Sequence, residues 1–274
     1  MHELPPAARE RLDRATRSGV RTSLLSAPSA VGLAAVGLEP VGEVMGCTVR
    51  TPQLLTAGPP THGDWRRGYD LDVFCKPRLD ARRTGYTSAL NRMRREAKAL
   101  RADGIVGITM TRGSLEGCDE YVAMGTAVRA QSKVRPKSLF TTDLSGTEVA
   151  KLMLAGWVPV QFLWAGAAQA RLKGFSARTT TNGIPFRGVA AEFDVHTALV
   201  DDTRSDARDT FNAMAADAKA DGSVVSDTSL STWEPFDGVV CALAVVRGTA
   251  VARFSQPDPT PTLTVLPLRR QGEC

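Results

Sequence analysis

The sequence predicts an α+β fold in which the same order of helices and strands occurs twice along the chain. Three short segments recur in the same order and at nearly one spacing: Gly37 and Pro40 with Gly156 and Pro159, Ala102-Asp103-Gly104 with Ala220-Asp221-Gly222, and Gly125-Thr126-Ala127-Val128 with Gly248-Thr249-Ala250-Val251. One such match can arise by chance, whereas three in register indicate an internal repeat. Each repeat also has the same order of expected helices and strands, so the fold class is predicted twice.

Each half is expected to open with a short helix followed by an apolar strand. The helices are expected at residues 29–36 and 147–154, and the strands at 40–45 and 159–164. Ser145 and Thr147 are of the type that caps helix N-termini, and Gly156 is a suitable C-terminal stop. The long stretches that follow exceed ordinary loop lengths, so extra strands are expected at 71–74 and 189–193.

A second, longer helix has a clear apolar face in both halves. The repeating apolar positions are Ala89, Met93, Ala97 and Leu100, and then Ala207, Phe211, Met214 and Ala218. Their spacing of three and four residues is that of one helix face. Asp-Gly follows each helix, and Gly104 and Gly222 are expected to end it in the left-handed conformation. Two hairpins are expected next, with strands at 105–111 and 121–128 and at 223–231 and 239–246.

These elements predict a domain organisation of two similar units with flanking pieces. The expected segments are an N-terminal helical leader at 1–35, the first domain at 36–133, a linker at 134–146, the second domain at 147–254 and a proline-rich C-terminal tail at 255–274. Within the leader, a helix is expected at 5–16. Within the tail, the short apolar run 262–268 could dock as a strand.

Composition excludes several classes of protein. The chain has 274 residues, of which 43% are hydrophobic and 23% charged, so wholesale disorder is excluded. No apolar run approaches the roughly 18 residues of a membrane span, and the polar N-terminus is no secretory signal. Five widely spaced cysteines give no pairing framework, so free thiols in a reducing cytoplasm are expected. The net charge of +5 permits anionic partners without requiring one.

Residues 97–108, Ala-Lys-Ala-Leu-Arg-Ala-Asp-Gly-Ile-Val-Gly-Ile, and the closing strand with Gly125-Thr126-Ala127-Val128 resemble the YbjQ-like family, which is associated with heavy-metal binding. The resemblance covers about residues 36–130 and, more weakly, 155–253. It implies tandem β-α-β-β domains of a YbjQ-like or dodecin-like kind. It also implies a homo-oligomer, because family members extend their sheets into rings, commonly pentamers. The two domains would then lie in two stacked rings or alternate within one five-fold or larger ring.

A metal site is the first alternative to a purely structural role. Paired Cys or His residues at spacings of two to four, which a structural zinc site needs, are absent. A site assembled in three dimensions could still use Cys47, His62, Cys75 and Cys118, with Cys47 as the first candidate for copper(I) or zinc. The second half keeps only Cys241 and His196. Buried free cysteines that act as small apolar side chains are the competing reading.

An anion site is the second alternative. Basic residues decorate the first long helix: Arg92, Arg94, Arg95, Lys98 and Arg101. Such a face, within the basic stretch 65–101, could contact an anionic ligand or nucleic acid, although sparse aromatic residues make nucleic acid the weaker choice. A solvated helix face, or contact with a more acidic domain of a neighbour, explains the same residues.

No catalytic motif is present, so the chain is expected to be non-enzymatic, a scaffold or a ligand-binding protein at subunit interfaces. An unknown protein partner is allowed for, and no membrane partner is expected. Glycines and aspartates at turns are expected to shape each domain: Gly46, Asp103, Gly104, Gly107 and Gly125, then Gly166, Asp221, Gly222 and Gly248.

Overall fold

The computed structural model describes residues 5–18, 22–51, 70–132, 135–172 and 194–254. The elements are α1 (Pro6–Ser18), α2 (Ala27–Ala35), β1 (Leu38–Arg50), the 3-10 helix η1 (Leu71–Phe74), α4 (Lys76–Ala99), β2 (Gly104–Leu115), β3 (Cys118–Ala130), β4 (Phe140–Thr141), α5 (Gly146–Leu154), β5 (Trp157–Leu172), α7 (Asp194–Asp217), β6 (Gly222–Phe236) and β7 (Val239–Arg253). The first sheet has the order β1-β3-β2-β4 and the second has the order β5-β7-β6. The mixed α+β class predicted from the sequence is confirmed.

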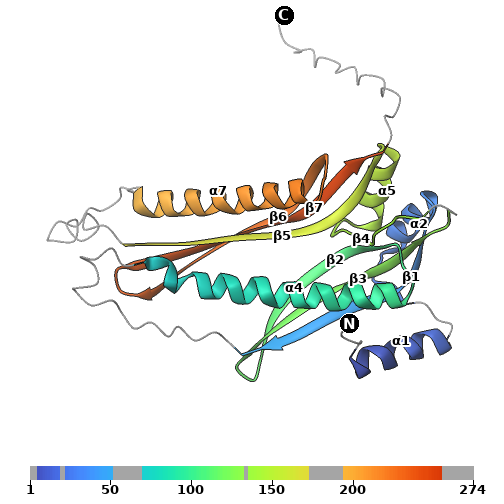
Figure 1. Cartoon of the computed structure of the whole chain (residues 1–274), viewed down its shortest axis with the longest axis horizontal. Coiled ribbons are helices and arrows are strands. Elements are labelled where there is room, and N and C mark those ends of the chain that lie inside the picture. The colour runs from blue at the N-terminus through green and yellow to red at the C-terminus, as the bar shows by residue number, and fades with distance from the viewer. Residues whose placement is uncertain (1–4, 19–21, 52–69, 133–134, 173–193, 255–274) are drawn as a thin grey trace, which may run out of the picture.

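The elements form alternating layers of helix and sheet (Figure 1). The helix α7 covers one face of the second sheet, and α4 lies between the second sheet and the first. The apolar face predicted for α4 is confirmed, because Ala89, Met93 and Ala97 are fully buried against the first sheet. In the second half, Ala207 and Phe211 of α7 are buried in the same way. None of the helices among the described residues is long and apolar enough to cross a membrane.

The two halves repeat several local details of the backbone. Gly37 and Gly156 follow α2 and α5 with φ values of 74° and 83°. The pairing of β1 with β3 shifts register just after Pro40, and that of β5 with β7 shifts just after Pro159. Because a register shift removes the need for a regular ladder hydrogen bond, proline is tolerated at these positions.

The Asp-Gly pairs also make matching contacts, but not the ones predicted. Asp103 accepts a hydrogen bond from Ala130 N–H at 2.8 Å, and Asp221 accepts one from Arg253 N–H at 2.8 Å. The left-handed residues are Arg101 and Lys219, each with φ 54°. The prediction that Gly104 and Gly222 end the helices was therefore wrong, since both begin a strand.

Other differences concern the strands. Both hairpins form as predicted, but the first strands are longer than expected: β1 runs from Leu38 to Arg50 and β5 from Trp157 to Leu172. Residues 71–74, predicted as a strand, form η1, because the Asp70 carboxylate accepts from Asp72 N–H and turns the chain. The predicted strands at 189–193 and 262–268 lie outside the described residues.

The segment between the halves contributes a strand to the first sheet and the N-cap of α5. Within the expected linker 134–146, Phe140–Thr141 forms β4, which pairs in parallel with Gly104 and Ile105 of β2. The helix α5 then begins with a capping box, in which Ser145 and Glu148 each satisfy a backbone N–H of the other. Ser145 is therefore the cap, as one of the two predicted candidates.

Candidate functional site

Cys47 lies on the edge strand β1 beside acidic and basic neighbours. Its thiol donates to the Glu120 carboxylate at 3.3 Å, and Arg92 donates to its backbone carbonyl. Burial and this carboxylate raise the pKa of the Cys47 thiol. A raised pKa disfavours the thiolate, which is the form that binds soft metals. Cys47 is thus a carboxylate-paired thiol and is not activated by its surroundings.

The other two described candidates do not lie in one cluster with it. Cys75 is fully buried with Cys241 and Phe74 in a small apolar cluster between the halves. Hydrogen bonding to Cys241 and burial raise the pKa of the Cys75 thiol. Cys118 is half-buried at the start of β3.

The described residues hold no group of three or more His, Cys, Asp or Glu side chains that could bind a metal ion. The fourth candidate ligand, His62, lies outside them. The metal set of Cys47, His62, Cys75 and Cys118 therefore stays a prediction, with Cys75 placed against Cys241 and Cys47 against Glu120.

The predicted basic face of α4 is not uniformly solvated. Arg94 is half-buried, its guanidinium lies 3.5 Å from Thr141 Oγ1, and burial lowers its pKa. Arg92 donates a hydrogen bond to the Cys47 carbonyl, and Arg95 donates to Asn91 O at 3.3 Å. Lys98 and Arg101 are exposed. These side chains fasten the edge of β1 and the junction with β4, so only part of the set is available to an anion.

A second group of arginines lies between α4 and both sheets. Arg82 is half-buried with a lowered pKa caused by burial, and its Nε has no hydrogen-bond partner. Arg78 stacks over the Trp233 ring at 4.5 Å, which uses its charge in a cation–π contact. Arg112 is paired with Asp119 at 2.6 Å. Arg82 is thus a cation without a carboxylate among the described residues.

Glu96 is a buried carboxylate that the sequence analysis did not single out. It is 3% exposed, accepts from Met45 N–H at 2.9 Å and pairs with Arg11 of α1. Burial raises its pKa, while Met45 N–H and Arg11 act in the opposite direction. Together with Arg92 it covers polar groups of the edge strand β1, one way in which proteins protect sheet edges. The sequence did contain a signal for this residue, because an acidic side chain lies beside the predicted apolar face of α4.

The predicted turn residues fall into two kinds. Gly107 has φ 63° and needs glycine for its conformation. Gly46, Gly104 and Gly248 instead permit close approach, since an added Cβ would lie 1.9 Å from Ala89 O, 2.1 Å from the Phe140 ring and 2.1 Å from Val224 O. Gly125 and Gly166 would meet Ile105 and Leu79 at 2.8 Å, whereas Gly222 has ordinary space. These residues set packing distances, and no ligand is needed to explain them.

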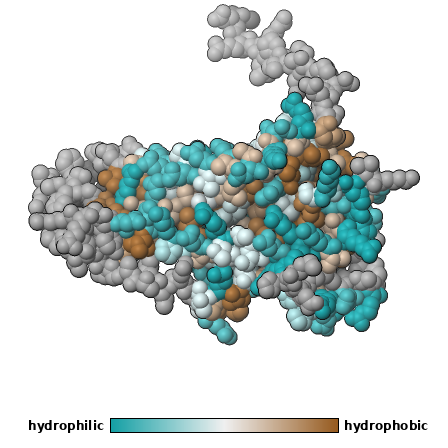
Figure 2. Space-filling view, in the orientation of Figure 1, coloured by the Kyte–Doolittle hydropathy of each residue, from teal (hydrophilic) through white to brown (hydrophobic). Residues whose placement is uncertain are grey.

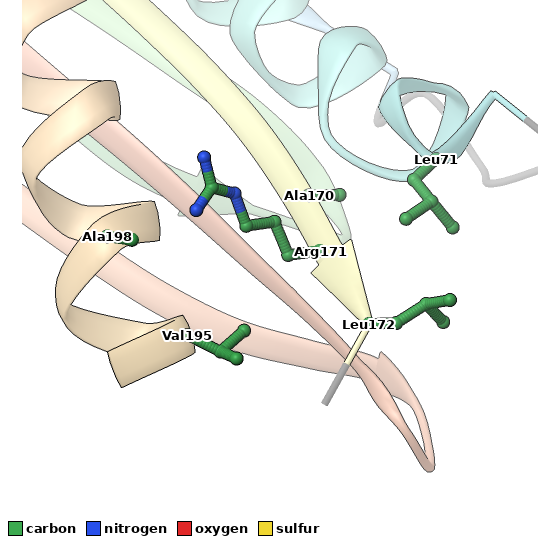
Figure 3. Close-up of a pocket in the computed structure, with 6 residues that line it drawn as sticks. All are labelled: Leu71, Ala170, Arg171, Leu172, Val195 and Ala198. Atoms are coloured by element: carbon green, nitrogen blue, oxygen red, sulfur yellow. The ribbon is translucent and has the colours of Figure 1, made fainter. Parts of the chain in front are cut away.

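An open cleft lies at the end of β5. It is lined by Leu71, Ala170, Arg171, Leu172, Val195 and Ala198, with a volume of about 470 Å³ (Figure 3). The Arg171 guanidinium is already paired with Asp202. At the other end of the molecule, where α2 and α5 lie, hydrophobic residues reach the surface (Figure 2), including Val31 at 70% and Leu154 at 72% exposure. Neither surface has the converging polar groups of a catalytic site.

Comparison with known proteins gives two matches. Residues 79–131 match the YbjQ-like family model, described as "Putative heavy-metal-binding". The chain is 36% identical over 168 residues to the "Encapsulin nanocompartment protein Rv1762c" of Mycobacterium tuberculosis (strain ATCC 25618 / H37Rv). This match spans 58% of the chain and only 60% of that relative. No solved structure is matched significantly.

The family match falls on the elements that carried the predicted resemblance. It begins at Leu79 in α4 and ends just after β3, so it includes Ala97 to Ile108 and Gly125 to Val128. The resemblance to the YbjQ-like family is therefore confirmed for residues 79–131.

Proposed function

We propose that this chain is a non-enzymatic, self-assembling cytoplasmic protein that acts as a scaffold in or with a protein nanocompartment. We propose further that its second half is a second copy of the YbjQ-like unit. Five-fold or stacked rings are the assemblies that the family resemblance suggests. Neither description that the chain matches names an enzymatic activity, and the relative is named as a nanocompartment protein.

The single observation that carries this proposal is the free edge of β6. The second sheet ends at β6, which has no further strand beside it among the described residues. Val224 and Val225 on this strand are 36% and 52% exposed. An exposed apolar edge strand is a template for pairing with another chain, and closed assemblies remove such edges. Self-assembly is thus the function that this surface supports best.

The proposal is tested by native mass spectrometry and light scattering of protein purified without chelator. A defined multiple of the 29.3 kDa chain supports it, and a monomer at micromolar concentration contradicts it. Co-isolation with a protein compartment tests the nanocompartment role. A chain that assembles by itself but never co-isolates with a compartment would contradict that role and leave self-assembly intact.

Soft-metal binding is a second candidate, favoured by the family description, and the half-buried Cys47 is the ligand to test first. Metal content of the natively purified protein and of Cys47→Ser decides it. A stoichiometric metal that disappears in Cys47→Ser supports the site, and a metal-free protein excludes it. Binding of an anion at Arg82 is a third candidate, favoured by its partnerless Nε, and steep salt dependence of binding would reveal it.

A further inference from the structure

The two halves of the chain are joined partly through a strand edge. The segment 140–144, which leads into α5, closes the outer edge of β2. Phe140 N–H donates to Asp103 O at 3.1 Å, Thr142 N–H donates to Ile105 O at 3.0 Å, and Ile108 N–H donates to Thr142 O at 3.1 Å. The lead-in segment of the second half thus pairs with the sheet of the first half.

The lead-in segment of the first half contacts the corresponding threonine but has no strand partner among the described residues. Leu24 N–H donates to Thr126 Oγ1 at 3.1 Å, whereas in the second half the Thr142 hydroxyl bonds to Thr249 Oγ1 at 2.8 Å. Thr126 and Thr249 occupy corresponding positions on β3 and β7. Residues 22–25 are described, and none of them lies in a strand. In the second half, the strand that corresponds to β2 is β6, and no described strand pairs with its outer edge.

The halves are also joined through a sheet face. Leu79 of α4 packs against Leu243 and Val245 of β7, and the Tyr86 ring lies 5.5 Å from the Trp164 ring of β5. With α7 on its other face, β7 is buried on both sides from residue 239 to 246. The helix of the first half therefore completes the burial of the second sheet.

Among the described residues, no long helix packs on the corresponding face of the first sheet. By the matching register of β1 with β5 and of β3 with β7, Met45 stands where Trp164 stands, and Val122 stands where Val245 stands. Both are only half-buried, as is the neighbouring Met124. This half-buried apolar strip is the surface that another long helix would cover.

The α7 helix offers a flank with complementary charge. Arg204 and Arg208 are exposed and occupy the positions that Tyr86 and Leu90 occupy on α4. Leu90 packs in the same cluster as Phe162, and Glu43 stands where Phe162 stands. A repeat of the same packing would bring Arg208 beside Glu43, an ion pair in place of an apolar contact.

We infer that chains join head to tail, with β6 and α7 of one copy receiving the lead-in segment 22–25 and the open face of the first sheet of the next copy. This inference rests on the proposed self-assembly and names its interface. One arrangement of neighbouring chains covers both the β6 edge and the open face of the first sheet, because it repeats the packing of the first half against the second half. Such a heterologous contact builds a ring if the rotation closes and a filament if it does not.

The test uses one variant on each side of the contact. Arg208→Glu places negative charge on the α7 flank, opposite the expected position of Glu43. Met45→Arg places positive charge on the sheet face, opposite the expected position of Arg204, because Met45 stands where Trp164 stands and Arg204 where Tyr86 stands. Each variant alone is expected to weaken assembly at least tenfold, since like charges then meet in the contact. Mixed together, the two variants retain one intact pair of surfaces and should form a dimer that stops at two chains. The control Ala213→Glu with Ala216→Glu changes the charge equally on another flank of α7 and should assemble as the wild type does.

A charge exchange guards against misfolding as the cause. Arg208→Glu combined with Glu43→Arg in one chain is expected to restore assembly. The interface is refuted if single variants assemble normally, if the mixture stays monomeric, or if the exchange restores nothing. If a chain lacking 255–274 fails to assemble while Arg208→Glu assembles, the inferred interface is wrong, and residues 255–274 rather than 22–25 are the partner of the β6 edge. A monomeric wild type would remove the proposed function itself, and that outcome is distinct from the others.

Discussion

The contact between Gly46 and α4 gives a direct test of the packing that holds the first half together. A Cβ at Gly46 would lie 1.9 Å from Ala89 O and 2.7 Å from Met93 N, whereas real Cβ atoms essentially never come within 3.0 Å of another heavy atom. Because these atoms belong to the helix backbone, Gly46→Ala must push α4 away from β1 by about 1 Å, which loosens the apolar contacts around Ala89. We expect a loss of about 3 kcal/mol of unfolding free energy, in the upper range of overpacking costs.

Thermal and urea unfolding followed by circular dichroism measure this effect. The expected fall in Tm is about 6–12 °C for a chain of this size. The matched control is Gly113→Ala on β2, where the added Cβ would lie 3.4 Å from Glu120 Oε2 and meet no backbone. It should change stability by less than about 1 kcal/mol. Equal stability of Gly46→Ala and Gly113→Ala would refute the reasoning.

Three further predictions concern buried groups. Arg11→Ala should cost about 1–2 kcal/mol at neutral pH, because the buried Glu96 carboxylate loses a partner. Burial raises the pKa of Glu96, so this loss should shrink as the pH falls through that raised pKa and the carboxyl becomes protonated. A pH-independent cost in urea titrations would contradict this. Cys75 and Cys241, both fully buried, should resist alkylation in the native protein and react only on unfolding, as mass mapping of labelled peptides would show; rapid native labelling would refute it. Phe140→Ala should cost about 2 kcal/mol in chemical unfolding, because its ring covers Gly104, and an unchanged midpoint would count against that contact.

Local features of this fold were predictable from the sequence, because they depend on residues near one another. The α4 face of Ala89, Met93 and Ala97 follows from helical spacing, and the Ser145 cap follows from its side chain. The Asp-Gly prediction failed for a tertiary reason: Gly104 is small because the Phe140 ring from the next half lies against it.

The parts that were missed depend on contacts between distant segments. Phe162 of β5 lies in the core of the first half, and Trp164 lies beside Tyr86, which periodicity within one strand does not reveal. The candidate ligands illustrate the same limit. Cys75 was grouped with Cys47 on residue type alone, whereas the fold places it against Cys241, more than a hundred residues further along the chain.

Intermolecular cross-linking tests the head-to-tail account most directly. A chain carrying both Glu43→Cys and Arg208→Cys, mildly oxidised and run without reductant, should give a ladder of dimers, trimers and larger species. The oxidised wild type, with its own five cysteines, the chains that carry only one of the two substitutions, and an equal mixture of those chains provide the comparison. Each chain with one substitution should give no species beyond those of the oxidised wild type, and the mixture should add only a cross-linked dimer. A double variant that stays monomeric while the wild type assembles, or a single variant that cross-links to itself as a symmetric dimer would, contradicts the account.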